Sequence, residues 1–164
     1  MYAPDQLDLA ILAEMEEDAR ISVSELARRL DSPNSTIRDR IRNLQENGVI
    51  LGYRTIIDPA KLGLGIKAIV HATRDQTVSL EDLRSEPVEF DEVTTVQLVT
   101  GETDELITVY ASSVDHLKDI IYNKVGTLPG VTRSNTAIVL EEKQYSLIRR
   151  FFAGSKAGSK AGNK

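Results

Sequence analysis

The segment from Thr36 to Leu51, TIRDRIRNLQENGVIL, carries the residues whose type and spacing best predict a binding chemistry. Ile37, Ile41 and Leu44 follow the three-to-four-residue spacing of a helix with one buried stripe. The side chains on the other faces include arginines, which can hydrogen-bond to guanine or to phosphate. A helix of this kind, with a second short amphipathic helix before it, predicts a helix-turn-helix that binds duplex DNA.

The expected base contacts lie mainly in the first half of this helix, because the N-terminal part of a recognition helix meets the base edges. An arginine can bind guanine through two hydrogen bonds, and an aspartate can accept from cytosine or orient an arginine. The two arginines of the preceding helix are expected on phosphates. The DNA-binding candidates are therefore Arg28, Arg29, Ser35, Thr36, Arg38, Asp39 and Arg42. Arginines that merely solvate an exposed helix are the alternative, which the helix-turn-helix context disfavours.

The first third of the chain has the helices needed to position these residues, and a β-rich stretch follows. The predicted elements are a helix over residues 5–18, a helix after the capping-box pattern Ser22–Glu25, a turn at 31–34, the arginine-bearing helix to about Asn47 with Gly48 as its left-handed stop, and a wing-like strand and linker over 49–57.

The second half alternates strands and helices in the order β-α-β-β-α-β, which is typical of a ferredoxin-like sandwich. The predicted elements are strands at 66–73, 93–100, 106–111 and 131–140, helices at 79–84 and 114–125, and a short final helix over 144–152. The free face of this sheet is expected to be apolar enough to need a partner, so self-association is predicted. The repetitive end, residues 153–164, is expected to be a disordered tail.

Composition narrows the class of protein. The 164 residues are 41% hydrophobic with a mean hydropathy of −0.22, and there is no cysteine to form disulfides or zinc fingers. No apolar run approaches the roughly 20 residues that span a bilayer, so a cytoplasmic protein without membrane contact is expected. The net charge of −5 is unevenly spread: residues 1–27 hold seven acids and one arginine, whereas residues 28–46 hold five arginines and three acids. A small positive patch on an acidic body is compatible with DNA binding and predicts that two subunits act together.

The Gly101–Asp104 loop between the predicted strands at 93–100 and 106–111 is a candidate ligand site. Its backbone amides could hold the carboxylate of an amino acid and Asp104 its ammonium group. A tight hairpin that uses glycine and aspartate for ordinary turn reasons is the alternative. His71 and His116 lack metal-ligand spacing and are predicted to be structural, and no catalytic or cofactor-binding motif is present.

Several ordered motifs resemble the Lrp/AsnC (feast/famine) family of transcriptional regulators. They are Asp5-x-x-Asp8-x-x-Ile11-Leu12, Thr36-Ile37-Arg38-x-Arg40-Ile41-x-x-Leu44, Gly48-Val49-Ile50-x-Gly52-Tyr53, Asp58-Pro59-x-x-Leu62-Gly63, Thr100-Gly101-x-x-Asp104 and Leu128-Pro129-Gly130-Val131. The resemblance implies an N-terminal winged helix-turn-helix and a C-terminal αβ sandwich (RAM-type) that forms dimers, often tetramers or octamers. It also implies a small effector, usually an amino acid, near the Gly-x-x-Asp loop. The effector-binding candidates are Thr100, Gly101, Thr103 and Asp104.

Three departures from the family pattern stand out. Pro33 replaces a serine ahead of the recognition helix, so the helix cap is expected at Ser32 or Asn34. Thr103 stands where the family often has an aromatic residue before the loop aspartate. The stretch at 79–93 matches poorly, and Pro87 is expected to shorten its helix.

The sequence thus predicts an α+β protein with four parts: a DNA-binding domain over 1–52, a linker strand over 53–63, a dimerisation and effector-binding domain over 64–152, and a tail. The predicted function is a sequence-specific, effector-modulated regulator of transcription that works without a cofactor. Two alternatives stay open. One is an enzyme on the same fold, as siroheme decarboxylases resemble this family, and the other is an amino-acid-binding accessory that does not bind DNA.

Overall fold

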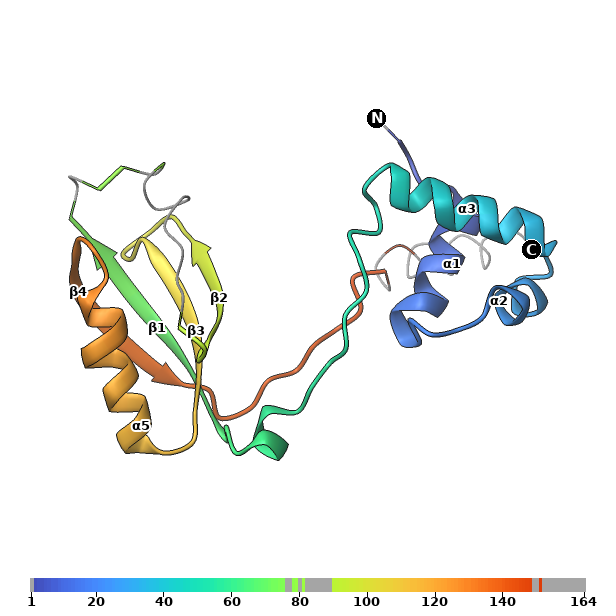
Figure 1. Cartoon of the computed structure of the whole chain (residues 1–164). Helices are drawn as coiled ribbons and strands as arrows, with labels where there is room; N and C mark the ends of the chain where they lie inside the picture. Colours follow the sequence, from blue (N-terminus) through green and yellow to red (C-terminus); the bar gives the residue numbers. More distant parts are fainter. Residues whose placement is uncertain (1, 76–77, 80, 82–89, 149–150, 152–164) are drawn as a thin grey trace, which may run out of the picture. The chain divides into compact units, whose positions relative to one another are not determined.

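The structure, a computed structural model, describes residues 2–75, 78–79, 81, 90–148 and 151 (Figure 1). The chain forms two compact units. The first contains the chain up to Thr55 and the segment from Lys143, and the second is Ile56–Glu142. The C-terminal segment therefore groups with the helical unit, whereas the sequence analysis placed residues up to 152 in the sheet domain. Glu16 makes this contact, because its carboxylate accepts from the Leu147 amide at 3.1 Å and from the Ser146 hydroxyl.

The first unit is a three-helix bundle. Its helices are α1 (Gln6–Glu17), α2 (Val23–Arg29) and α3 (Asn34–Glu46), which matches the predicted elements. Five buried side chains form its core: Ile11, Leu26, Ala27, Ile37 and Leu44. Ile41, Val49 and Ile50 pack against this core, so the apolar stripe predicted on the third helix faces inward. Gly48 ends α3 in the left-handed conformation, with φ +68°.

The helix caps differ from the prediction at two places. Ser22 accepts from the Glu25 amide at 3.1 Å, but the Glu25 carboxylate binds arginines and does not reach back, so the capping box there is incomplete. The cap predicted at Ser32 or Asn34 is wrong: Pro33 is the N-cap residue of α3 and no side chain caps this helix. The Ser32 hydroxyl instead donates to the Leu30 carbonyl, since it lies one residue too early to reach the first turn.

The predicted wing strand does not form within this chain. Residues 51–58 have no regular secondary structure, and Leu51 and Ile56 are 95% and 87% exposed. A strand needs a neighbour to pair its backbone groups, and no described strand lies beside this segment. The final helix predicted over 144–152 is wrong in its first half, because residues 144–148 have no helical structure. Most of the predicted helix over 79–84 and the whole tail lie outside the described residues.

The second unit is a four-stranded antiparallel sheet in the order β2-β3-β1-β4, which is the predicted ferredoxin-like arrangement. Its strands are β1 (Ile66–Arg74), β2 (Val93–Leu98), β3 (Glu105–Ala111) and β4 (Val131–Ile138). Helix α5 (Val114–Asp119) continues through a π-helical turn (Ile120–Lys124) and a 3-10 turn (Val125–Thr127). A 3-10 turn at Pro59–Leu62 precedes the sheet.

Burial alternates along β1 and β3, which defines two faces of the sheet. One face packs its alanines, valines and isoleucines against Leu117, Ile120 and Val125. The other face carries Ile69 and Leu106 among mostly polar neighbours, so it is less apolar than predicted. None of the helices in the described ranges is long and apolar enough to cross a membrane.

Candidate nucleic-acid interface and ligand hollow

The face of α3 opposite its buried stripe presents the predicted base-contacting residues. Ser35, Arg38, Asp39 and Arg42 are exposed, and Thr36 is half-buried. Arg42 Nη2 donates to Asp39 Oδ1 at 2.7 Å, so the aspartate holds this arginine along the helix surface. The Arg38 side chain has no hydrogen bond or ion pair with any residue that the structure describes. It is therefore the guanidinium of this helix that is free to bind another molecule.

The two arginines predicted on phosphates are already engaged inside the protein. Glu25 accepts from Arg28 Nη2 at 2.7 Å and from Arg29 Nε at 2.8 Å, and Arg29 Nη1 also donates to Glu14 at 2.6 Å. Hydrogen bonds from Arg28, and then from Arg29, lower the pKa of Glu25 to about 2. Arg28 keeps 72% of its side-chain surface exposed and Arg29 keeps 46%. Arg28 is thus the better placed of the two for an outside phosphate.

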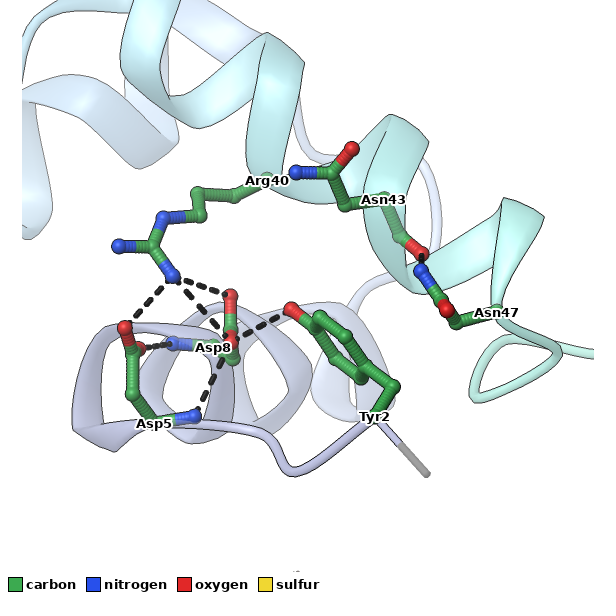
Figure 2. Close-up of polar contacts among 6 residues, drawn as sticks. All are labelled: Tyr2, Asp5, Asp8, Arg40, Asn43 and Asn47. Carbon is green, nitrogen blue, oxygen red and sulfur yellow. Dashed lines mark hydrogen bonds and ion pairs between the residues drawn. The ribbon is translucent and has the colours of Figure 1, made fainter.

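Arg40 lies on the same helix but has a different role, which the sequence analysis did not assign (Figure 2). Its Nη1 donates to Asp5 Oδ2 at 2.6 Å and lies 3.4 Å from both oxygens of Asp8. Asp8 is 1% exposed and also accepts from the Tyr2 hydroxyl at 2.8 Å. At 100° per residue Arg40 flanks the stripe of Ile37, so helical spacing was the signal that could have shown its inward direction.

The start of α3 is open to an anion. Its first N–H groups lack intrahelical partners, as in every helix, and no side chain caps them. A shallow concavity at the turn between α2 and α3 is lined by Ser24, Arg28, Ser32 and Asn34, among others. The helix dipole favours negative charge at this end, so a DNA phosphate would find both backbone donors and Arg28 there.

The predicted effector loop joins β2 to β3. Asp104 Oδ2 accepts from the Arg74 amide at 2.8 Å, and the Asp104 amide donates to the Ala72 carbonyl at 3.0 Å. Asp104 therefore fastens the loop to the end of β1, which is the ordinary turn role. Gly101 has φ +136° and supplies the left-handed geometry that the turn requires.

A hollow of about 310 Å³ lies beside this loop on the face of the sheet opposite α5. It is lined by His71, Thr73, Glu102, Thr103, Arg133, Asn135 and Ala137. Of the four predicted effector residues, only Thr103 is among them. The strand residues were missed although the two-residue alternation of β1 and β4 places His71, Arg133 and Asn135 on one face.

The second histidine belongs to a separate polar cluster. Glu92 accepts from Lys124 Nζ at 2.7 Å, which together with His116 lowers the pKa of Glu92 to about 2. The Ser112 amide donates to His116 Nδ1 at 3.2 Å, so the ring proton lies on Nε2, 3.2 Å from Glu92. His116 thus stabilises the structure, as predicted. The described residues contain no group of three His, Cys, Asp or Glu side chains that could hold a metal ion.

Comparison with known proteins identifies both units. Residues 4–50 match the winged helix-turn-helix DNA-binding family, and residues 67–148 match the Lrp/AsnC ligand binding domain. A DNA-binding domain joined to a ligand-binding domain defines a transcriptional regulator. The chain belongs to the Lrp/AsnC family of transcriptional regulators, which confirms the predicted family and fold.

Individual relatives agree over nearly the whole chain. The HTH-type transcriptional regulator LrpA of Pyrococcus horikoshii is 34% identical over 84% of this chain and 97% of the relative, and the regulatory protein AsnC of Escherichia coli is 31% identical over 85% and 92%. The structure of Escherichia coli AsnC has a TM-score of 0.80 at 26% identity, covering 90% of this chain and 99% of that one. A feast or famine regulatory protein of M. tuberculosis, solved in complex with L-methionine, has a TM-score of 0.78 at 27% identity, covering 88% and 97%.

Proposed function

We propose that this regulator binds specific DNA sequences as a dimer or a larger assembly, with α3 in the major groove, and that a bound amino acid modulates this binding. The observation that carries the proposal is Arg38: it is exposed on the outer face of α3 and has no partner in the described part of the chain. Arg42, held by Asp39 at 2.7 Å, is the second base-contacting candidate. Ser35 and Thr36 lie one turn earlier, where a recognition helix approaches the base edges.

The charge distribution supports an assembly of at least two subunits. Of the five arginines on α2 and α3, four have an ion pair with a described residue, and the net charge of the chain is −5. Non-specific phosphate attraction is therefore weak, and two α3 helices are needed to reach useful affinity. In a symmetric dimer they would contact half-sites about one helical turn, roughly 10 bp, or a multiple of it apart. We place this activity in the cytoplasm, where bacterial and archaeal DNA lies.

The test is a gel-shift assay at fixed salt with the full chain and the DNA upstream of its own gene. Arg38→Ala should weaken specific retention by about 5- to 150-fold, the range for one lost arginine–guanine pair of ~1–3 kcal/mol. Lys118→Ala, which removes one exposed cation from α5 in the other unit, is the charge-matched control and should bind as the wild type does. Specific retention that is unchanged in Arg38→Ala combined with Arg42→Ala would overturn the assignment of α3.

The proposal also holds that the protein is a regulator and not an enzyme. A siroheme-decarboxylase-like activity would need a basic, histidine-lined pocket of tetrapyrrole size, whereas the hollow on the sheet is about 310 Å³ and contains one histidine. Purified protein should accordingly show no tetrapyrrole absorbance, and a retained Soret-type band would favour the enzyme. An accessory role would show as amino-acid binding without DNA retention at low salt.

A further inference from the structure

The charges of the chain are divided between two very unequal parts. Residues 143–164 hold six cations and no acid, so their net charge is +6. Because the whole chain has a net charge of −5, the other residues, 1–142, have a net charge of −11. A block of like charge joined to a body of opposite charge is typical of an arm that binds another molecule. The six cations are Lys143, Arg149, Arg150, Lys156, Lys160 and Lys164.

This basic segment begins on the helical unit. The residues from Lys143 onward group with the three-helix bundle and not with the sheet. Glu16, near the end of α1, anchors the segment there, because its carboxylate accepts from the Leu147 amide at 3.1 Å and from the Ser146 hydroxyl. Five of the six cations follow this anchor along the chain. The anchor therefore ties them to the unit that matches the winged helix-turn-helix DNA-binding family.

The two helices expected on DNA supply few cations for its phosphates. Four of the five arginines on α2 and α3 have an ion pair with a carboxylate of the same chain. The fifth, Arg38, lies on the face of α3 that is suited to base contacts. The sequence-independent part of DNA affinity comes from lysines and arginines that neutralise phosphates. Residues outside these two helices are therefore better placed to supply it.

We propose that residues 149–164 form an arm that binds the phosphates of the duplex contacted by α3, without reading its sequence. This inference rests on the DNA binding proposed above and adds a second contact to it. The chain from Leu147 to Lys164 spans at most about 60 Å, and α3, with 13 residues, is about 20 Å long. Lys156, Lys160 and Lys164 are spaced by stretches that span at most about 14 Å, so each can meet a different phosphate.

Two other partners would attract the same charges: an anionic membrane and the acidic residues of this chain. Residues 153–164 contain no aromatic or large aliphatic side chain that could enter a bilayer, and stable membrane anchoring needs such a group beside the basic one. The carboxylates near the anchor, such as Glu17 and Asp18, are exposed and dispersed. DNA attracts the arm more strongly, because its dense charge condenses counterions that a bound cation releases.

The test is fluorescence anisotropy of the full chain with a labelled duplex of unrelated sequence at several salt concentrations. The substitutions Lys156→Ala, Lys160→Ala and Lys164→Ala are combined in one variant, and Lys→Arg at the same three positions is the charge-matched control. Each phosphate contact contributes about 0.9 to the slope of log affinity against log salt concentration. We expect the alanine variant to lower this slope by about 0.9 to 2.7 per subunit and the arginine variant to keep it. A difference of about 2.7 means roughly 40-fold more loss of affinity for the unmodified chain between about 50 and 200 mM salt.

The anchor is tested by Glu16→Ala, with Glu17→Ala as the control that removes the same charge from the neighbouring residue. Glu16→Ala should bind the unrelated duplex more weakly than Glu17→Ala does. The arm is then no longer held on the helical unit, so its effective concentration near the bound DNA falls. The salt slope should be the same for both variants, because all the cations remain. Equal affinities of the two variants would show that Glu16 does not position the arm.

Equal salt slopes for the alanine and arginine variants would overturn the arm, and binding of the full chain to phosphatidylserine vesicles would then identify a membrane as the partner of the basic segment. Tighter DNA binding by the alanine variant would also overturn it, because the segment would then lie on the acidic surface of its own chain. Gel shifts with the upstream DNA keep the two proposals apart. Specific retention with equal slopes leaves the assignment of α3 standing, and a lysine-dependent slope without specific retention leaves the arm standing.

Discussion

The polar cluster around Asp8 should control the stability of the helical unit (Figure 2). Asp8 is 1% exposed, and its carboxylate accepts from the Tyr2 hydroxyl at 2.8 Å and from the Asp5 amide at 3.0 Å. Arg40 Nη1 adds a longer contact at 3.4 Å. Asp5 is the N-cap residue of α1 and forms a capping box with Asp8. The Asp8→Ala substitution removes the acceptor of all these hydrogen bonds and leaves the Asp5 amide without its partner in that box.

The expected loss in the free energy of unfolding follows from these contacts. Two well-formed hydrogen bonds at about 0.5–1.5 kcal/mol each, with a smaller contribution from the long contact, come to about 2–3 kcal/mol. Alanine regains roughly half a kcal/mol of helix propensity over aspartate. We therefore expect Asp8→Ala to lower the free energy of unfolding by about 2 kcal/mol. Asp39→Ala is the matched control, because it removes an exposed ion pair within α3 and should cost less than about 0.5 kcal/mol.

Urea unfolding of the full chain, followed by circular dichroism at 222 nm, measures this difference, since most of the described helix belongs to this unit. The cluster should also make the unit sensitive to acid. The amide of Asp8, and then Arg40, lower the pKa of Asp5 from its ordinary value of 3.8. The unfolded chain therefore takes up this proton first, and the stabilisation present above about pH 4 is lost as the pH falls below it. A cost for Asp8→Ala no larger than that for Asp39→Ala would refute the reasoning.

Three further substitutions test other parts of the fold. Lys124 donates to Glu92 and lowers the pKa of its carboxyl group to about 2. The sheet unit should therefore lose stability as the pH falls from about 4.5 towards 2. Glu92→Gln should make this loss smaller, which urea midpoints measured from pH 3 to 7 would show. Gly48→Ala forces a β-carbon into φ +68° and should cost about 1 kcal/mol in urea unfolding, whereas Gly65→Ala, with open space around it and no such φ, should cost nothing measurable. Ser22→Ala removes the cap of α2 and should lower the thermal midpoint by the equivalent of about 1 kcal/mol; an unchanged midpoint would show that the cap is unimportant.

Local periodicity was enough to predict the three helices of the first unit and the four strands of the second. The helical spacing of Ile37, Ile41 and Leu44 and the alternation along residues 66–73 come from interactions within a few residues, and the structure confirms both. The end of the third helix at Gly48 could be predicted as well, because the left-handed conformation that ends a helix depends on a single residue. The strand order also followed from the order of elements, since few topologies suit β-α-β-β-α-β.

Which residues from distant segments of the chain contact each other could not be predicted in the same way. Helical spacing places Arg40 beside the buried stripe, but Asp5 is 35 residues away, and nothing local shows that it is the partner of Arg40. The hollow has the same origin, because it depends on Asn135 meeting His71 across a strand pairing whose register is fixed only in the folded sheet. The prediction of a wing strand over 49–57 was wrong although its sequence favours a strand. A strand also needs a neighbouring strand to pair with, and the local sequence does not show whether one is present.

The acidic start of the chain now has a structural explanation that bears on DNA recognition. Asp5 and Asp8 hold Arg40, and Glu14 with Glu25 holds Arg29. These carboxylates neutralise arginines that would otherwise attract any phosphate. Among the described residues of α2 and α3, the arginine left without a partner is Arg38, on the face suited to base contact. Because general phosphate attraction carries no sequence information, this pairing lowers non-specific affinity more than specific affinity. If α3 is the recognition helix, as we propose, an acidic protein with one arginine on that helix that has no described partner is better suited to discrimination between sites than to tight binding of any DNA.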